Sequence, residues 1–274
     1  MKIRRLIGII ALALLAIGRL SAEGTDSLNV EHENILRVHF GGTWLQDQYL
    51  SPLRYNGMQV ALGNEWWQPF RHHPHWAHVG QAEVHFAWMY SSARNNLIYN
   101  LDVSGGWGAY YSWTWKQPRL QLLLGPYLHL DFAPRMHARE VNKPYSMDIA
   151  ADVCAMAGVA YCFGAGKVDF RLRYLVRANL IGVDFMPDYW ESYYELSEGV
   201  KGQVRCSGMW NHRLLRHELT LDIRCPHSTW RIGIAHTYLE YGKDNIWFSR
   251  EQVEAVVGTC FRYRIHPSKA FDVW

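Results

Sequence analysis

Residues 97–115, with the sequence LIYNLDVSGGWGAYYSWTW, alternate between apolar and polar or very small side chains over an unusual length. A period of two places the two sets on opposite faces of a β-strand. At roughly 3.3 Å per residue this strand would span about 60 Å, several times the usual length in globular proteins. The apolar face carries Tyr99 toward one end and Tyr111, Trp113 and Trp115 toward the other. Aromatic ends around an aliphatic middle are typical of a strand that crosses a membrane.

The start of the chain predicts export. A basic stretch at 2–5 precedes an apolar run at 6–17, and small residues at 20–22 offer a cleavage point. The run is too short to span a bilayer as a helix. We therefore expect residues 1–22 to be a cleavable signal peptide and residues 23–274 to form one outer-membrane β-barrel domain.

Charge excludes one class of partner. The sequence has 28 Lys and Arg against 25 Asp and Glu, and four of the basic residues lie in the predicted leader. Subtracting them leaves 24 basic and 25 acidic residues, a net charge of −1, so nucleic-acid binding has no support. We expect the partners to be outer-membrane lipid and, during biogenesis, the barrel-assembly machinery.

The same alternation recurs along the chain, with apolar residues on one face and polar residues on the other. Eleven segments show it, at 36–44, 58–66, 76–88, 97–115, 120–132, 149–163, 168–180, 200–210, 215–224, 230–238 and 253–265. This pattern predicts an all-β fold, a closed antiparallel up-and-down transmembrane barrel of 10–12 strands. Bacterial barrels have even strand numbers, so a twelfth strand is expected near residues 246–249, and twelve is the favoured number.

Turn lengths orient the predicted barrel. Connections after Trp115, at 164–166 and at 211–212 are short, whereas 134–146 and 184–198 are long, and the short end is expected to be periplasmic. A two-residue hairpin at 211–212 would pair Gly208 with Leu215, apolar face against apolar face, and a similar turn at 165–166 would pair Tyr161 with Phe170. The connection at 225–228 is short, although the alternation of short and long connections predicts a long loop there.

A soluble periplasmic β-barrel binding protein would show the same alternation with its apolar rows pointing inward. A closed barrel of eleven or more strands with an apolar interior would leave a lumen too wide for side chains to fill. Charged pairs and water can occupy such a lumen once the apolar rows face lipid, and closure leaves no unpaired strand edge. The sequence therefore favours the membrane barrel.

Four stretches, together with the predicted leader, carry a family resemblance: YLSPLRY at 49–55, NKPYS at 142–146, PDYWESYYE at 187–195 and MWNH at 209–212. The chain resembles, over nearly all of its predicted mature length, a family of uncharacterised bacterial outer-envelope proteins known only as a domain of unknown function. The family has no assigned activity, so the resemblance implies an envelope location and adds no catalytic residue.

Two groups of residues are candidate sites. The first is a row of charged side chains on lumenal faces: Asp148, Asp152, Asp169, Arg171, Arg173, Arg177, Lys201, Arg205, Arg216, Glu218, Asp222, Arg224 and Arg231. These could line an anion-favouring pore, but acids and bases alternate closely enough to form ion pairs, which favours a largely filled lumen. The second is a long loop whose side chains form a binding surface or pack over the barrel mouth: Asp188, Tyr189, Trp190, Glu191, Tyr193 and Tyr194.

Catalytic and metal sites have weaker support. An outer-membrane lipid hydrolase, of phospholipase or deacylase type, needs a Ser and a His on one strand face, and the His-x-Ser spacing occurs only at 266–268. His72, His73, His75 and His78 crowd one segment, but no Cys or carboxylate accompanies them at ligand spacing, and Pro74 prevents helical spacing. We expect no cofactor, and a structural, binding or limited-permeation role ahead of catalysis.

Overall fold

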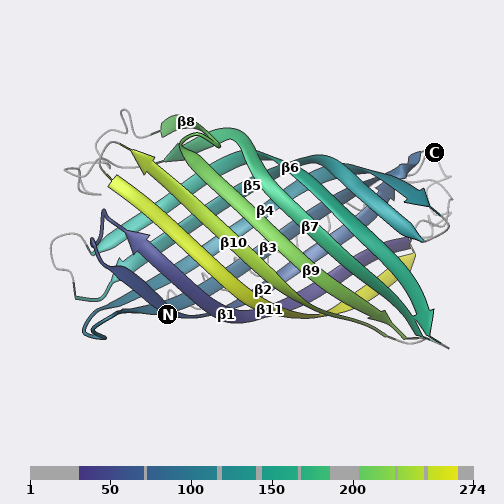
Figure 1. Cartoon of the computed structure of the whole chain (residues 1–274), viewed down its shortest axis with the longest axis horizontal. Coiled ribbons are helices and arrows are strands. Elements are labelled where there is room, and N and C mark those ends of the chain that lie inside the picture. The colour runs from purple at the N-terminus through teal and green to yellow at the C-terminus, as the bar shows by residue number, and fades with distance from the viewer. Residues whose placement is uncertain are drawn as a thin grey trace, which may run out of the picture.

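The computed structural model describes residues 31–70, 73–115, 119–139, 144–165, 168–185, 204–225, 228–243 and 246–264. These residues form eleven β-strands: β1 (Glu31–Asp47), β2 (Arg54–Phe70), β3 (His73–Ser91), β4 (Leu97–Trp115), β5 (Leu120–His137), β6 (Tyr145–Ala165), β7 (Val168–Phe185), β8 (Val204–Gly208), β9 (His212–Arg224), β10 (Thr229–Lys243) and β11 (Ile246–Arg264). The strands run diagonally across the molecule (Figure 1). Within these ranges no helix has the length and hydropathy needed to cross a membrane.

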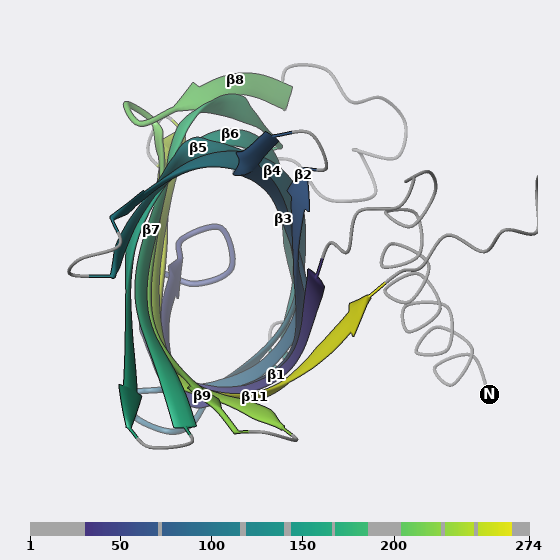
Figure 2. The ribbon, with the colours of Figure 1, turned by 90° about the vertical axis from the view of Figure 1, so that its right-hand side faces the viewer.

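Ten of the strands close into an antiparallel barrel. The sheet runs from β6 through β1 and β11 to β7, and a β6–β7 pairing closes it, while β8 pairs only with the end of β7. Seen end-on, β8 lies outside the rim of the barrel (Figure 2). We can start at Val38 on β1 and move from each residue to its partner on the next strand. The path through β2, β3 and β4 reaches Phe132 on β5, whereas the path through β11, β10, β9, β7 and β6 reaches Leu120 on the same strand. This twelve-residue stagger produces the tilt that closure requires.

The apolar rows face outward and the charged rows face inward. On β1, Leu36, Val38 and Phe40 are 52%, 47% and 51% exposed, whereas the intervening Arg37 and His39 are fully buried. An outer wall of this kind is stable against acyl chains and would be unfavourable in water. The predicted all-β, closed antiparallel transmembrane barrel is therefore confirmed, and its apolar rows do not meet in the middle.

The predicted hairpin at 211–212 is wrong. β8 and β9 both run antiparallel to β7, with Val204 opposite Phe185 and Leu215 opposite Ala178, so they follow one another along the same edge. The turn between them bonds the Asn211 amide to the Gly208 carbonyl (3.0 Å) and the Gly208 amide to the Asn211 side chain (2.9 Å). These bonds shift the chain sideways and do not reverse it.

This correction explains the strand count. The favoured number of twelve is wrong, because residues 246–249 are the beginning of β11 and because β8 and β9 together occupy one position in a ten-stranded barrel. The short 225–228 turn then lies at the same end as the β4–β5 and β6–β7 connections, together with the start of β1 and the end of β11. Across the 166–167 connection the register differs by two residues, with Tyr161 opposite Leu172, which leaves the facing unchanged.

Glycines on β4 make room for a lumenal ring. A Cβ on Gly106 would lie 2.2 Å from the Leu128 carbonyl oxygen and 2.5 Å from the Tyr127 ring, and one on Gly108 would also strike Tyr127. The fully buried Tyr127 ring therefore lies over bare backbone. Gly105, on the outer face, meets nothing closer than 3.3 Å.

The connection between β1 and β2 folds into the mouth of the barrel. The amides of Leu50 and Ser51 bond to the Asp47 carbonyl (3.1 and 2.8 Å), and the Tyr49 amide bonds to the Asp47 carboxylate (3.1 Å). Tyr49 and Leu50 are consequently buried, and Figure 2 shows this connection within the outline of the barrel. The end with the longer connections is therefore partly covered from inside.

Candidate functional site

The upper lumen, toward the β1–β2 connection, is held by two arginines. The Arg250 guanidinium lies 2.8 Å from Asp102 and 3.3 Å from Asp131, which belong to β4 and β5 on the opposite wall. Above it, Arg135 contacts Asp47 (3.0 Å) and pairs with Asp148. Both contact sets span the interior, so the two walls are tied together across the lumen.

Aromatic rings fill the space beside Arg135. Its guanidinium stacks over the Phe248 ring at 4.3 Å, and Phe248 in turn stacks on Tyr241. The Tyr241 hydroxyl donates to Asp148, and the Tyr55 hydroxyl bonds the His137 ring at 2.8 Å. This layer combines cation–π, stacking and hydrogen-bond contacts, as a packed interior does and a water-filled channel does not.

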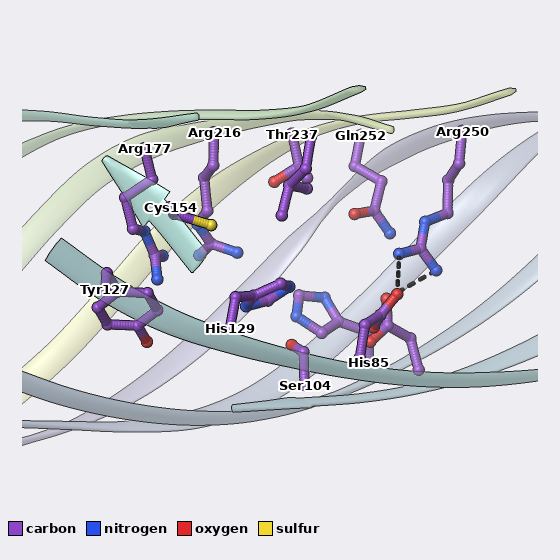
Figure 3. Close-up of a pocket in the computed structure, with 13 residues that line it drawn as sticks. His85, Ser104, Tyr127, His129, Cys154, Arg177, Arg216, Thr237, Arg250 and Gln252 are labelled. Carbon is purple, nitrogen blue, oxygen red and sulfur yellow. Dashed lines mark hydrogen bonds and ion pairs between the residues drawn. The ribbon is translucent and has the colours of Figure 1, made fainter. Parts of the chain in front are cut away.

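Below this layer lies a small cavity. Its lining includes His85, Ser104, His129, Arg177 and Thr237, and these side chains converge from both walls (Figure 3). The cavity measures about 30 Å³. That space suits one or two water molecules and is too small for an organic solute.

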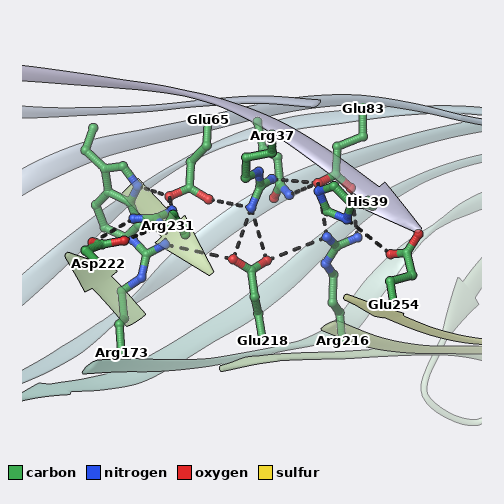
Figure 4. A network of polar contacts seen from close by, with 12 residues as sticks. Arg37, His39, Glu65, Glu83, Arg173, Arg216, Glu218, Asp222, Arg231 and Glu254 are labelled. Carbon is green, nitrogen blue, oxygen red and sulfur yellow. Dashed lines mark hydrogen bonds and ion pairs between the residues drawn. The ribbon is translucent and has the colours of Figure 1, made fainter. Parts of the chain in front are cut away.

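The lower lumen is built around Arg37, which has three carboxylate partners. Its guanidinium lies 2.8 Å from Glu65, 2.6 Å from Glu83 and 3.0 Å from Glu218 (Figure 4). Glu65 also accepts from Arg173 (2.8 Å). These residues come from β1, β2, β3, β7 and β9, so their contacts fix the relative positions of five of the ten barrel strands.

Two flanking clusters extend the lower network. On one side, Arg231 bridges Glu65 (2.7 Å) and Asp222 (2.5 Å). On the other side, His39 and His85 share Glu254 at 3.3 and 3.1 Å. Buried ions of this kind are tolerated because each has opposite charges and hydrogen-bond donors within reach.

Most of the predicted lumenal residues take part in these contacts. Arg173, Glu218 and Arg231 lie at the centre of the lower network, and Asp148 lies in the upper layer. Arg216 joins the lower network through Glu83 (2.8 Å), and Arg177 lies over the Tyr127 ring (4.6 Å) beside the cavity. The others have these contacts: Arg171 with Asp222 (2.7 Å), Arg224 with Glu33 (3.0 Å), Asp152 with His212 (3.6 Å) and Arg205 with Asp184 (2.7 Å). Asp169 is exposed at the start of β7, outside the network. Lys201 and the predicted loop surface, Asp188 to Tyr194, lie outside the described residues.

The predicted set omits half of the network. Arg37, Glu65, Glu83, Arg250 and Glu254 are all buried in the lumen. The alternation places these residues on polar faces, which is the signal that identifies them. The predicted set was drawn only from residues 148–231, whereas a closed barrel needs partners from all of its strands.

The crowded histidines do not assemble into a metal-holding group within the described residues. This part of the chain contains no group of three or more His, Cys, Asp or Glu that could hold a metal ion. Of the crowded histidines, His75 stacks on Tyr111 and His78 packs between Phe70 and Trp107, while His72 lies outside the described ranges. The His-x-Ser pair at 266–268 also lies outside them.

A lipid-compatible wall around a lumen crossed by paired charges defines a closed transmembrane β-barrel. The family model for a protein of unknown function, DUF3316, matches residues 7–249. The chain therefore belongs to the DUF3316 family, as the resemblance in the sequence indicated. No curated protein matches the sequence.

Several solved barrels are similar in fold. Neisserial surface protein A is 10% identical, with 83% of this chain and 97% of that chain covered and a TM-score of 0.32. The outer membrane protease OmpT from Escherichia coli is 8% identical, with coverage of 88% and 99% and a TM-score of 0.44. The β domain of the Bordetella autotransporter BrkA is 10% identical, with coverage of 85% and 99% and a TM-score of 0.41.

Proposed function

We propose that the protein is a bacterial outer-membrane barrel whose lumen is closed to organic solutes and which acts as a structural or binding component of the envelope. The observation that carries this proposal is the network of buried charges that crosses the lumen on Arg37, Arg135 and Arg250 and leaves a cavity of about 30 Å³. An open diffusion pore keeps a continuous aqueous path.

The outer-membrane location is part of the proposal. The exposed apolar wall supports insertion in lipid, closure satisfies the backbone along both edges, and the predicted signal peptide supports export. The even strand number of ten agrees with bacterial outer-membrane barrels. So does the position of the start of β1 and the end of β11, which both lie at the end of the barrel that has the short turns. Any permeation is then restricted to water or small ions.

Liposome swelling and single-channel recording on the purified chain test the proposal. We expect no swelling with a pentose and no stable channel, because the side chains that cross the lumen block the path. The double variant Arg37→Ala with Glu65→Ala removes two central side chains and is expected to increase permeation, whereas Leu128→Ala on the outer wall is not. Swelling of wild-type vesicles at the rate of an open porin would overturn the closed-lumen function.

A further inference from the structure

One sector of the outer wall departs from the apolar pattern. Arg213 and His217 on β9, His236 and Glu240 on β10, and Glu251 on β11 point outward, and we call these five residues the outer-wall polar patch. Their direction follows from the chain neighbours, which face the lumen: Arg216 and Glu218 beside His217, Ala235 and Thr237 beside His236, and Arg250 and Gln252 beside Glu251. The strands of this sector lie side by side in Figure 1.

The patch extends into the middle of the wall. His236 is the central residue of the fifteen-residue strand β10, and His217 lies directly opposite it on β9. The outward neighbours of these two histidines are apolar and exposed, as Ile234 (57%) and Leu219 (45%) illustrate. The two histidines therefore lie within the band that acyl chains would contact.

The patch residues are linked to one another. The His217 and His236 rings stack with centroids 6.0 Å apart, and His236 contacts Glu251 at 3.3 Å. Arg213 pairs with Glu240 at 3.1 Å. The side chains of His236 and Glu251 remain 36% and 40% exposed, and that of Arg213 remains 59% exposed, whereas its partner Glu240 is 10% exposed.

Among the described positions the opposite wall carries no outward ion pair, and its one outward histidine on β3, His78, packs against Phe70 and Trp107. On β5 every outward side chain over the same span is apolar: Leu122, Leu124, Pro126, Leu128, Leu130 and Phe132. Ionisable side chains facing lipid are costly and rare, and they commonly mark a functional surface. The concentration of outward ion pairs on β9, β10 and β11 indicates that this sector meets something other than lipid.

We propose that the outer-wall polar patch is the interface with a second copy of this chain, packed side by side in the membrane. A two-fold interface sets the same patch of each copy against the other, so the patch must carry both members of every complementary pair. This patch carries Arg213, His217 and His236 together with Glu240 and Glu251. The exposed side chains of Arg213, His236 and Glu251 in one copy would then be covered by the other copy, which removes their contact with acyl chains.

The inference rests on the membrane location proposed above, and cross-linking in lipid vesicles tests it separately. A background with Cys154, Cys162, Cys206, Cys225 and Cys260 replaced by alanine receives Val253→Cys, next to Glu251 on the outer face of β11. Its matched control is Leu128→Cys on β5, on the far side of the barrel; the two residues are 40% and 45% exposed. A bifunctional maleimide is added to vesicles of diluted, folded protein.

We expect a cross-linked dimer from Val253→Cys and little from Leu128→Cys. Adding His236→Leu with Glu251→Leu is expected to reduce the dimer at least about tenfold, equivalent to about 1.4 kcal/mol. These leucines suit a lipid-facing wall, so heat-modifiable mobility on gels should show that the variant still folds. Protein that folds into vesicles but cross-links equally weakly at both positions would overturn the dimer alone. Failure to insert into vesicles would overturn the proposed membrane location.

Discussion

Replacing Arg37 by leucine tests whether the lumenal charges hold the barrel together. Arg37 is fully buried and lies between 2.6 and 3.0 Å from Glu65, Glu83 and Glu218. One unit-charge contact at about 2.8 Å is worth roughly 6 kcal/mol before desolvation, with an effective dielectric constant of about 20. Much of this is offset by the cost of removing the ions from water.

The net loss depends on the partners that remain. Glu65 keeps Arg231 at 2.7 Å and Glu83 keeps Arg216 at 2.8 Å, but Glu218 is left with contacts no shorter than 3.6 Å. One carboxylate is thus left poorly compensated, and breaking a buried pair in this way costs about 3–5 kcal/mol. We expect Arg37→Leu to lower the free energy of unfolding by that amount.

Urea titration in lipid vesicles, followed by tryptophan fluorescence, measures the effect. The control is Arg54→Leu, whose guanidinium is 63% exposed and 3.9 Å from Glu251, with an expected change of about 0–1 kcal/mol. Adding Glu218→Gln to Arg37→Leu removes the poorly compensated charge and should restore about 1–3 kcal/mol. If Arg37→Leu were as stable as the wild type, or if Glu218→Gln gave no recovery, the lumenal charges would not act as a connected network.

Two further predictions concern the wall. Leu128→Arg, in the middle of the lipid-facing surface, is expected to lower the unfolding free energy by about 2–4 kcal/mol, whereas Leu53→Arg in the β1–β2 connection should cost less than about 1 kcal/mol in the same titration; equal costs would contradict the facing. Gly106→Ala must displace backbone or the Tyr127 ring and is expected to cost about 1–3 kcal/mol, against less than about 1 kcal/mol for Gly105→Ala. Similar melting temperatures for the two alanine variants would refute the close-packing argument.

The alternation identified the facing of nearly every strand because lipid and lumen impose opposite chemistry on neighbouring residues. It could not identify the direction of the chain after Asn211. The pairing predicted for a hairpin there matched apolar rows equally well, and only the bonds between Gly208 and Asn211 turn the chain sideways. The short turn at 225–228 and the odd number of eleven segments were the two signs in the sequence that the hairpin was wrong.

Site prediction was limited by a different factor. The sequence predicts which residues lie on the polar face of each strand. It does not predict which of them meet across the lumen, because the stagger of the barrel determines those pairs. Glu65 and Arg231 are 166 residues apart and touch only once ten strands have closed. Local patterns therefore predict which residues are lumenal and leave their pairing to the closed structure.

The seam between β1 and β11 has a consequence for biogenesis. Every residue of the first strand, Glu31–Asp47, pairs with the last, Phe248–Arg264. β1 can pair with β2 early, but its edge toward β11 has no strand partner until residues 248–264 are in place. A nascent or truncated chain ending before residue 248 would present an open β edge to lipid, so insertion can finish only after nearly all of the polypeptide has been delivered.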